Sequence, residues 1–331
     1  MNKKIAVVGA GGWGTALASI ISKKSAVLLW CYEKEIVDEI KINHSNNDYL
    51  PNVELSENII PFDDIERLED VDIIINTVPT QFIRSVYSQI NFSVSDKVFV
   101  NAAKGIEKES LKRISEIFND ILNVEANHYA TLTGPSHAEE VSKNIPSAVV
   151  VASKDIDLAK YIRDLMSTGT FRIYSSTDVV GCELGGALKN IIAIAYGIAE
   201  AIELGDNTKA MLITRGLAEI ARLGSACGAN INTISGLSGL GDLVVTCNSK
   251  RSRNRTVGEL LGQGLLIEDI RGRNKMVAEG IETTKSALLL AKKLEVELPI
   301  IEQVYNVIYN RLPANQAVDN LLAREFKNEI W

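Results

Sequence analysis

One stretch decides the fold of this chain: Ile5-Ala6-Val7-Val8-Gly9-Ala10-Gly11-Gly12-Trp13-Gly14, in which a short apolar run breaks into G-x-G-x-x-G. A helix-compatible segment, 15–21, follows it. Gly9 permits a tight turn, Gly11 lets the backbone approach a pyrophosphate, and Gly14 lets a helix pack closely on the strand. Phosphates then meet free N–H groups at the helix start, where the helix dipole favours negative charge. The stretch therefore predicts the phosphate turn of a dinucleotide-binding fold.

The residues after this turn support that interpretation. A lone G-x-G-x-x-G is a weak signal, because glycine turns between strands and helices are common. Here a second apolar run, 26–30, ends close to Glu33, which lies 24 residues after Gly9. An acidic residue about 20 residues beyond the turn hydrogen-bonds the nucleotide ribose in folds of this type. We therefore favour a cofactor site over a purely structural turn.

The same segment also imitates a secretory signal peptide, because it combines Lys3-Lys4, an apolar run and Ala16-Leu17-Ala18. Four glycines between 9 and 14 interrupt the apolar run, which argues against that alternative. The chain has four cysteines that are far apart and form no C-x-x-C pair: Cys31, Cys182, Cys227 and Cys247. This pattern fits reduced thiols and argues against structural zinc, so we expect a cytoplasmic protein without a metal.

Length and composition limit the classes of protein that remain. A chain of 331 residues with 46% hydrophobic content can bury a large core and suggests about two domains. Its net charge of −7 gives no general attraction to nucleic acid or to anionic membranes. The most apolar segment, 184–202, approaches membrane-spanning length but carries Lys189 and Glu200. We interpret it as a buried helix rather than a membrane-inserted one.

The first half of the chain alternates strand-like and helix-like segments, which is typical of βαβ units around a parallel sheet. The predicted strands are 5–8, 26–30, 72–78, 97–101, 129–133 and 148–152. Predicted helices between them include 81–90 and 110–121. This order predicts an α/β, Rossmann-like doubly wound domain at the N-terminus.

The pattern changes near residue 180, after which long helical segments dominate. They include 183–203, 208–224, 253–261, 283–294 and 300–309. We therefore expect a dinucleotide-binding domain over 1–180 and an all-α domain over 181–331 that carries substrate binding and catalysis. No long linker separates them, so they should pack closely with a cleft between them.

Two strand ends, 76–80 and 101–105, fall where open α/β sheets bind ligands, outside the carboxyl ends of the strands. Lys104 follows an apolar strand and precedes a glycine, so it could reach into that crevice. A solvated loop lysine is the equal alternative at this position.

Lys189 is the only cation in the apolar helical stretch 184–195. Desolvation would lower its pKa, and a lysine tuned in this way can transfer a proton near neutral pH. The alternative is a lysine whose stem packs in the core while its tip reaches water. We favour the functional lysine.

A second glycine-rich turn, 236–242, ends at Asp242 and is followed by the strand-like or buried segment Leu243-Val244-Val245. The glycines suit close backbone approach, and Asp242 could accept hydrogen bonds from a ligand. An aspartate that only caps its own turn is the alternative.

A basic cluster, 250–256, stands out in this acidic protein. Ser252 can cap a helix there, which would gather Arg253, Asn254 and the first-turn N–H groups into a site for a phosphate dianion. Four cations without interleaved aromatics match a nucleic-acid patch poorly, so small-phosphate binding leads over a solvated charged surface. The three histidines, His44, His128 and His137, show no triad or metal-ligand spacing, although His137 could line the cleft.

Together these motifs resemble one family, the bacterial NAD(P)-dependent sn-glycerol-3-phosphate dehydrogenases. The matching motifs run in order along nearly the whole chain: 9–18, 104–105, 134–136, 183–190, 239–242, 252–255, 276–280 and 298–300. The resemblance implies reduction of dihydroxyacetone phosphate to sn-glycerol 3-phosphate, the backbone precursor of phospholipids, with NAD or NADP as the cofactor.

The resemblance also implies roles for individual residues. The implied catalytic residues are Lys189, which exchanges a proton with the substrate oxygen, Lys104 and Asp242. The implied substrate-binding residues are Lys104, Gly134, Ser136, Lys189, Asn190, Asp242, Ser252, Arg253 and Asn254. The implied cofactor-binding residues are Gly9, Gly11, Gly12, Trp13, Gly14, Tyr32, Glu33, Lys104, Ala138, Arg253, Val277 and Glu279.

Two departures from the family bear on the cofactor. Gly12 stands where many relatives have serine, and Tyr32 stands where many have a basic residue that could meet the 2′-phosphate of NADP. Glu33 would repel that phosphate, whereas Lys34 opposes the repulsion, so we expect a tilt toward NADH.

The alternatives at this point are a 6-phosphogluconate or β-hydroxyacid dehydrogenase and a redox sensor that binds the dinucleotide without turnover. Apolar C-terminal helices favour a homodimer.

Overall fold

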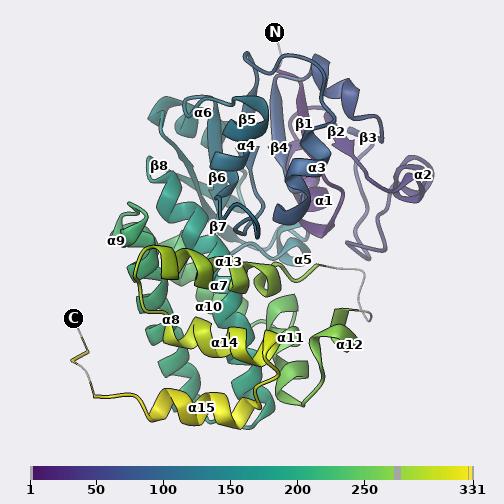
Figure 1. Cartoon of the computed structure of the whole chain (residues 1–331). Helices are drawn as coiled ribbons and strands as arrows, with labels where there is room; N and C mark the ends of the chain where they lie inside the picture. The colour runs from purple at the N-terminus through teal and green to yellow at the C-terminus, as the bar shows by residue number, and fades with distance from the viewer. Residues whose placement is uncertain (1–2, 272–276, 327, 330–331) are drawn as a thin grey trace.

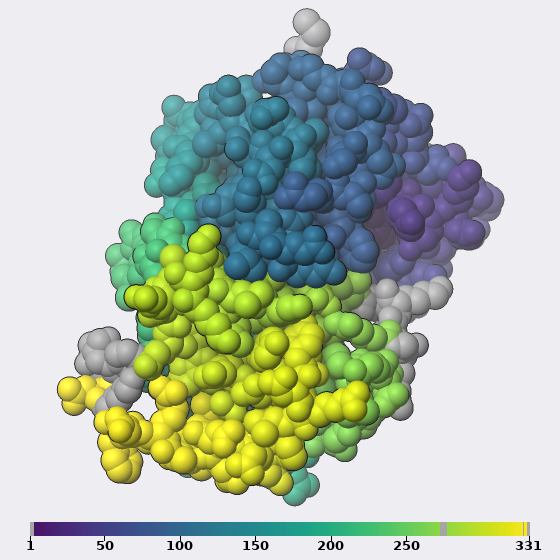
Figure 2. Space-filling view, in the orientation of Figure 1, coloured from purple at the N-terminus to yellow at the C-terminus, as the bar shows by residue number. Residues whose placement is uncertain are grey.

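The computed structural model describes residues 3–271, 277–326, 328 and 329. A sheet with flanking helices forms one half of the molecule, and a helical half packs directly beneath it (Figure 1). In the space-filling view the two halves meet along a broad, continuous boundary (Figure 2). The expected α/β architecture, a doubly wound sheet followed by helices, is confirmed.

The sheet has eight strands in the described residues, in the order β3-β2-β1-β4-β5-β6-β7-β8. They are β1 (Ile5–Val8), β2 (Val27–Trp30), β3 (Ile59–Phe62), β4 (Ile73–Asn76), β5 (Val98–Asn101), β6 (Tyr129–Thr133), β7 (Ser147–Ser153) and β8 (Phe171–Ser176). Every neighbouring pair is parallel except β6 and β7. The order reverses beside β1, so the ends of β1 and β4 form the crevice where such sheets bind ligands.

Helices cover both faces of this sheet. They are α1 (Gly12–Ile21), α2 (Lys34–Asn43), η1 (Ile65–Asp70), η2 (Thr80–Phe82), α3 (Ile83–Tyr87), α4 (Ile114–Leu122), α5 (Ala138–Val141) and α6 (Ile156–Met166). Alternate residues of β1 belong to different cores: Ile5 and Val7 pack with α1, α2 and α6, while Ala6 and Val8 pack with α3 and α4. The near-continuous apolar strands follow from this burial on both faces.

The structure corrects several predicted elements. Strands β3 and β8 were not predicted; both are the edge strands of the sheet, with one face partly exposed. The predicted helix 81–90 is a 3₁₀ turn followed by a short α3, and the helix predicted over 110–121 begins only at Ile114. Leu243-Val244-Val245, interpreted as strand-like or buried, lies inside a helix.

The C-terminal half is helical throughout its described residues. Its elements are α7 (Val179–Ala201), α8 (Asp206–Ala226), α9 (Ile231–Ile234), the π-helical turn η3 (Leu237–Gly241), α10 (Asp242–Asn248), α11 (Arg253–Gly262), α12 (Ile267–Arg271), α13 (Glu279–Lys293), α14 (Pro299–Tyr309) and α15 (Ala314–Leu322). Helix α7 runs through the middle of this half (Figure 1).

Two glycines let α7 and α11 approach each other closely. A Cβ on Gly197 would lie 2.1 Å from the Arg255 carbonyl oxygen, and a Cβ on Gly258 would lie 2.1 Å from that of Ile194. Among the described residues, α7 alone is long and apolar enough to cross a membrane, and 94% of its most apolar window is buried inside the molecule. It is the central helix of the core.

Candidate active site

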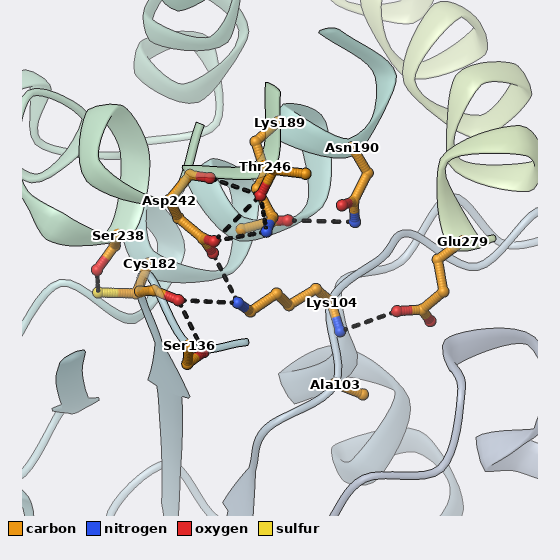
Figure 3. A network of polar contacts seen from close by, with 12 residues as sticks. Ala103, Lys104, Ser136, Cys182, Lys189, Asn190, Ser238, Asp242, Thr246 and Glu279 are labelled. Carbon is orange, nitrogen blue, oxygen red and sulfur yellow. Dashed lines mark hydrogen bonds and ion pairs between the residues drawn. The ribbon is translucent and has the colours of Figure 1, made fainter. Parts of the chain in front are cut away.

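The site is built where the carboxyl ends of the strands meet the start of the helical half (Figure 3). Lys104, in the loop after β5, points its ammonium group across this seam. Its Nζ donates to Asp242 Oδ2 at 2.6 Å and to the Gly134 carbonyl oxygen, just after β6, at 3.1 Å. The solvated-loop alternative for Lys104 is therefore wrong, because its side chain is held inside the site.

Lys189 lies on the opposite side of the same carboxylate. It comes from the middle of α7, and only 6% of the residue is exposed. Its Nζ donates to Asp242 Oδ1 at 2.5 Å and to Thr246 Oγ1 at 2.6 Å. A lysine whose tip reaches water is excluded by this geometry.

The protonation of Lys189 and of Asp242 is shifted by burial and by their charged neighbours. Burial lowers the pKa of Lys189 to about 8, although Asp242 favours its charged form; Lys104 adds to the lowering. For Asp242, 1% exposed, burial alone would raise the pKa, but the two ammonium groups outweigh it and hold the pKa below its ordinary value. The cluster therefore keeps a stable carboxylate beside a lysine that can lose its proton near neutral pH.

Sequence reasoning missed Thr246, the second partner of Lys189. Its hydroxyl donates to the Asp242 backbone oxygen at 2.6 Å, so its lone pairs face the ammonium group. Asp242 and Thr246 are four residues apart and share one face of α10. Had 242–248 been assigned as a helix, this spacing would have placed the two side chains together.

The predicted phosphate turn forms at the start of α11. Ser252 caps the helix, because its side chain accepts from the Arg255 N–H. Asn254 points inward, donating to Asn190 Oδ1 at 3.0 Å and accepting from the Gly280 N–H at 3.0 Å. The turn is thus joined to α7, one residue after Lys189, and to the first turn of α13.

Glu279 connects the helical half to the strand ends. Its carboxylate accepts from the Thr80 N–H at 2.7 Å, from Thr80 Oγ1 at 2.8 Å and from the Lys104 N–H at 3.3 Å. Burial raises the pKa of this carboxyl against the effect of those hydrogen bonds. Nearby, Arg253 donates to the Val277 carbonyl oxygen at 2.8 Å. Arg253, Val277 and Glu279 therefore lie at the seam between the two halves of the molecule.

The glycine turn has the geometry that its sequence predicts. Gly9 has φ of +109°, and a Cβ on Gly14 would lie 1.9 Å from the Gly9 carbonyl oxygen, whereas a Cβ on Gly11 would meet nothing within 4 Å. The N-cap residue of α1 is Gly11, which has no side chain to cap the helix, and no described side chain accepts from the first-turn N–H groups. Open space over Gly11 and an uncapped helix start fit a bound pyrophosphate.

The remaining cofactor candidates surround this turn. Ala138 lies beside Gly12, its Cβ 3.7 Å from where a Cβ on Gly12 would stand. The Trp13 indole N–H is buried and has no hydrogen-bond partner among the residues that the structure describes. At the end of β2, Tyr32 is 78% exposed, and Glu33 accepts from the Tyr49 hydroxyl at 2.7 Å.

His137 and Ser136 lie in the segment that follows β6. Ser136 donates to the Gly134 carbonyl oxygen at 2.9 Å, next to Lys104. Burial of the His137 imidazole, together with nearby Lys189, lowers its pKa. Within the described part of the chain, no group of three or more His, Cys, Asp or Glu side chains could hold a metal ion.

Comparisons with known proteins match both halves of the chain. Residues 4–159 match the family described as NAD-dependent glycerol-3-phosphate dehydrogenase N-terminus, and residues 178–319 match its C-terminus. A glycerol-3-phosphate dehydrogenase [NAD(P)+] from Geobacter sp. (strain M21) is 46% identical over 333 residues, covering 99% of each chain. The enzyme of the same name from Bacillus subtilis (strain 168) is 46% identical, covering 99% of this chain and 96% of the relative.

Solved structures agree with the sequence comparisons. A glycerol-3-phosphate dehydrogenase from Coxiella burnetii superposes with a TM-score of 0.92 at 37% identity, covering 98% of this chain and 99% of the other. A D-mandelate dehydrogenase superposes with a TM-score of 0.63 at 15% identity, covering 97% of this chain and 100% of the other, and shares the fold alone.

Proposed function

The chain belongs to the family of NAD-dependent glycerol-3-phosphate dehydrogenases, and from that premise we propose that Lys189, Asp242 and Lys104 form its catalytic centre. The protein is an NAD(P)-dependent oxidoreductase that reduces dihydroxyacetone phosphate to sn-glycerol 3-phosphate, the backbone precursor of phospholipids. Family membership excludes the two alternatives left open by the sequence, another phosphosugar or hydroxyacid dehydrogenase and a non-catalytic dinucleotide sensor.

Lys189 is the proposed proton donor to the substrate oxygen. When bound, the reduced nicotinamide supplies a hydride to the carbonyl carbon, which builds negative charge on the oxygen. Lys189 and Lys104 carry positive charges at this seam; Lys189 is 6% exposed, and the side chain of Lys104 is 15% exposed. Charge stabilisation of this kind, in a site of low dielectric, is usually the largest catalytic contribution.

The hydrogen bonds of Lys189 leave one proton available. Of its three N–H donors, one is directed at Asp242 Oδ1 and one at Thr246 Oγ1. The third has no partner among the described residues and would be the proton given to the substrate. Asp242 and Thr246 thus orient the lysine, and Asp242 stabilises its charged form.

The substrate phosphate is proposed to bind at the start of α11, to Ser252, Arg253, Asn254 and the first-turn N–H groups. Because this phosphate lies away from the reacting carbon, its binding energy can hold the carbonyl in place without being lost during reaction. Gly134, Ser136 and Asn190 are proposed to line the space between the phosphate and Lys189.

The cofactor is proposed to run from the glycine turn, along Gly9, Gly11, Gly12, Trp13 and Gly14, to the seam. Ala138, Lys104, Arg253, Val277 and Glu279 are the proposed contacts near its reactive end. At the other end, Glu33 and Tyr32 are proposed to favour NADH, because a carboxylate repels the 2′-phosphate of NADPH.

Three further proposals concern the whole chain. The domains are proposed to be 1–180 and 181–331, supported by the change from β8 to α7 between Ser176 and Val179. A cytoplasmic location is supported by the free thiols of all four cysteines. A homodimer is supported by the exposed apolar side chains of Leu322 and Phe326 near the C-terminus.

The Lys189–Asp242–Lys104 network is the observation that carries this proposal, and Lys189→Met tests it. We expect purified protein to oxidise NADH only when dihydroxyacetone phosphate is supplied. Absorbance at the nicotinamide band measures this oxidation. Lys189→Met should lower kcat by about 10²- to 10⁴-fold, the range for a lost general acid, while NADH binding followed by fluorescence is retained. Lys160→Met, on α6 and remote from the seam, is the matched control. Native turnover by Lys189→Met would refute the mechanism.

A further inference from the structure

The loop between α2 and β3 contacts the nucleotide site at three places. Asn46, fully buried, donates from Nδ2 to the Ala10 carbonyl oxygen and to Thr15 Oγ1, both at 2.8 Å. The Tyr49 carbonyl oxygen lies 2.7 Å from where a Cβ on Gly12 would stand. The Tyr49 side chain then reaches Glu33 at the end of β2. Residues 46–49 of this loop therefore touch the glycine turn and the Glu33 carboxylate together.

Tyr49 is held firmly in this position. The Leu50 N–H donates to the Asn46 carbonyl oxygen at 2.8 Å, and the half-buried Tyr49 ring packs against the core shared by α1 and α2. Its hydroxyl donates to Glu33 Oε1 at 2.7 Å, whereas the side chain of Glu33 does not cap α2, the helix that it precedes. The position of the Glu33 carboxylate is thus set by the phenol.

We propose that Tyr49 is a coenzyme-specificity residue, which orients Glu33 to accept from the 2′-hydroxyl of the adenosine ribose and to exclude a 2′-phosphate. This inference rests on the proposed function, since it concerns the coenzyme of the same reaction. Nothing in the sequence motifs singles out Tyr49, which lies 16 residues beyond Glu33.

The chemistry of the pair suits selection of NADH. A neutral phenol donates to one carboxylate oxygen and leaves the negative charge of Glu33 in place. An arginine at the same position would instead cancel that charge. The other oxygen, Oε2, is left for a ribose hydroxyl. Burial and the bond to Glu33 raise the pKa of Tyr49 to about 12, so the phenol stays a donor through the working pH range. Lys34, next to Glu33, is exposed and makes no hydrogen bond to this carboxylate among the described contacts.

The test is a binding measurement on Tyr49→Phe, which removes only the hydroxyl. Dissociation constants for NADH, NADPH and NADH lacking the adenosine 2′-hydroxyl are followed by nicotinamide fluorescence. We expect about a 3- to 10-fold weaker affinity for NADH, the range for one net hydrogen bond, and no change for the 2′-deoxy compound. The KM for dihydroxyacetone phosphate should not change. A purely structural role would weaken all three coenzymes equally and would overturn the inference, as would unchanged NADH affinity.

Glu33→Gln provides an independent arm. It should improve NADPH affinity by about tenfold, because the repelling charge is gone, and the effect of Tyr49→Phe on NADH should shrink in that background. Tyr161→Phe, an exposed tyrosine on α6, is the matched control. A wild-type protein that binds NADPH more tightly than NADH would also overturn the inference. Because binding is measured directly, failure of this inference is distinguishable from absence of turnover with dihydroxyacetone phosphate, which would instead overturn the proposed function.

Discussion

At the scale of single residues, the proposed catalytic centre is one carboxylate shared by two ammonium groups. Asp242 accepts from Lys104 with one oxygen and from Lys189 with the other. Removal of either lysine would leave the buried carboxylate with a weaker counter-charge, and removal of Asp242 would leave two ammonium groups facing each other. Lys104 and Asp242 therefore both affect the protonation of Lys189, and the two lysines together keep Asp242 ionised.

The pH dependence of catalysis follows from the pKa of Lys189, which is about 8. Reduction needs the protonated lysine, so kcat/KM for dihydroxyacetone phosphate should fall as pH rises through about 8, at saturating NADH. Oxidation of glycerol 3-phosphate needs the neutral lysine and should rise over the same range. Asp242→Asn removes the group that favours the charged form and should move the falling limb to lower pH. A limb that stays in place in this variant would contradict the assignment.

Sequence alone identified Lys189, Lys104 and Asp242 as candidates, because isolated charges in apolar or glycine-rich surroundings are costly unless they are used. It could not show that Lys104 and Lys189 share one acceptor, since they are 85 residues apart and lie on different halves. No sequence pattern marked Thr246 or Tyr49 as a site residue, because the role of a hydroxyl depends on the group that it hydrogen-bonds in the folded chain.

At the scale of elements, two glycines of the turn before α1 are expected to serve different purposes: Gly14 allows close backbone packing, and Gly11 leaves space for the cofactor. Gly14→Ala would bring a Cβ to 1.9 Å from the Gly9 carbonyl oxygen, so we expect lower thermal stability and loss of the turn. Gly11→Ala meets nothing within 4 Å, so it should keep the wild-type Tm but weaken NADH binding by at least about tenfold, because the pyrophosphate needs that space. Thermal unfolding and NADH titration of both variants give the comparison. Equal loss of Tm in the two variants would contradict it.

Elements buried on both faces of the sheet were the ones predictable from sequence. Six strands were found within a few residues of their true ends, because their apolar runs are continuous. The two edge strands gave weaker signals: β3 contains Pro61, and β8 alternates buried Phe171 and Ile173 with exposed Arg172 and Tyr174. Residues 243–245 were predicted only to be strand-like or buried, since a short apolar run fits a strand and a buried helix equally. They lie in α10, with Leu243 buried and Val244 exposed.

At the scale of the whole molecule, one buried carboxyl links stability to pH. Glu219, on α8 and 2% exposed, accepts from the Ile300 N–H at 2.7 Å and the Ile301 N–H at 3.1 Å, at the start of α14. Burial raises its pKa from 4.5 to about 7, although those N–H groups act in the opposite direction. The folded state therefore holds this proton more tightly than the unfolded state. The proton bound to Glu219 stabilises the folded state in full below about pH 4.5, and this contribution is lost as pH rises through about 7.

Urea unfolding at pH 5 and pH 8 tests this linkage. The free energy of unfolding of the wild type should fall by on the order of 3 kcal/mol more than that of Glu219→Gln over this interval. Glu302→Gln, an exposed change on α14, is the control and should follow the wild type. If wild type and Glu219→Gln lose stability in parallel, Glu219 does not carry the effect.

The close approach of α7 and α11 has a consequence for the length of substrate that the enzyme can bind. Gly197 and Gly258 hold the two backbones together, and Asn254 binds Asn190 beside the reactive lysine. The proposed anchor for the phosphate and the proposed donor of the proton are thus joined through this helix packing, which fixes the distance between them. A four-carbon homologue with one more methylene between the carbonyl and the phosphate would carry its carbonyl past the proposed proton donor, so the packing of these two helices should limit the carbonyl-to-phosphate spacing of a substrate.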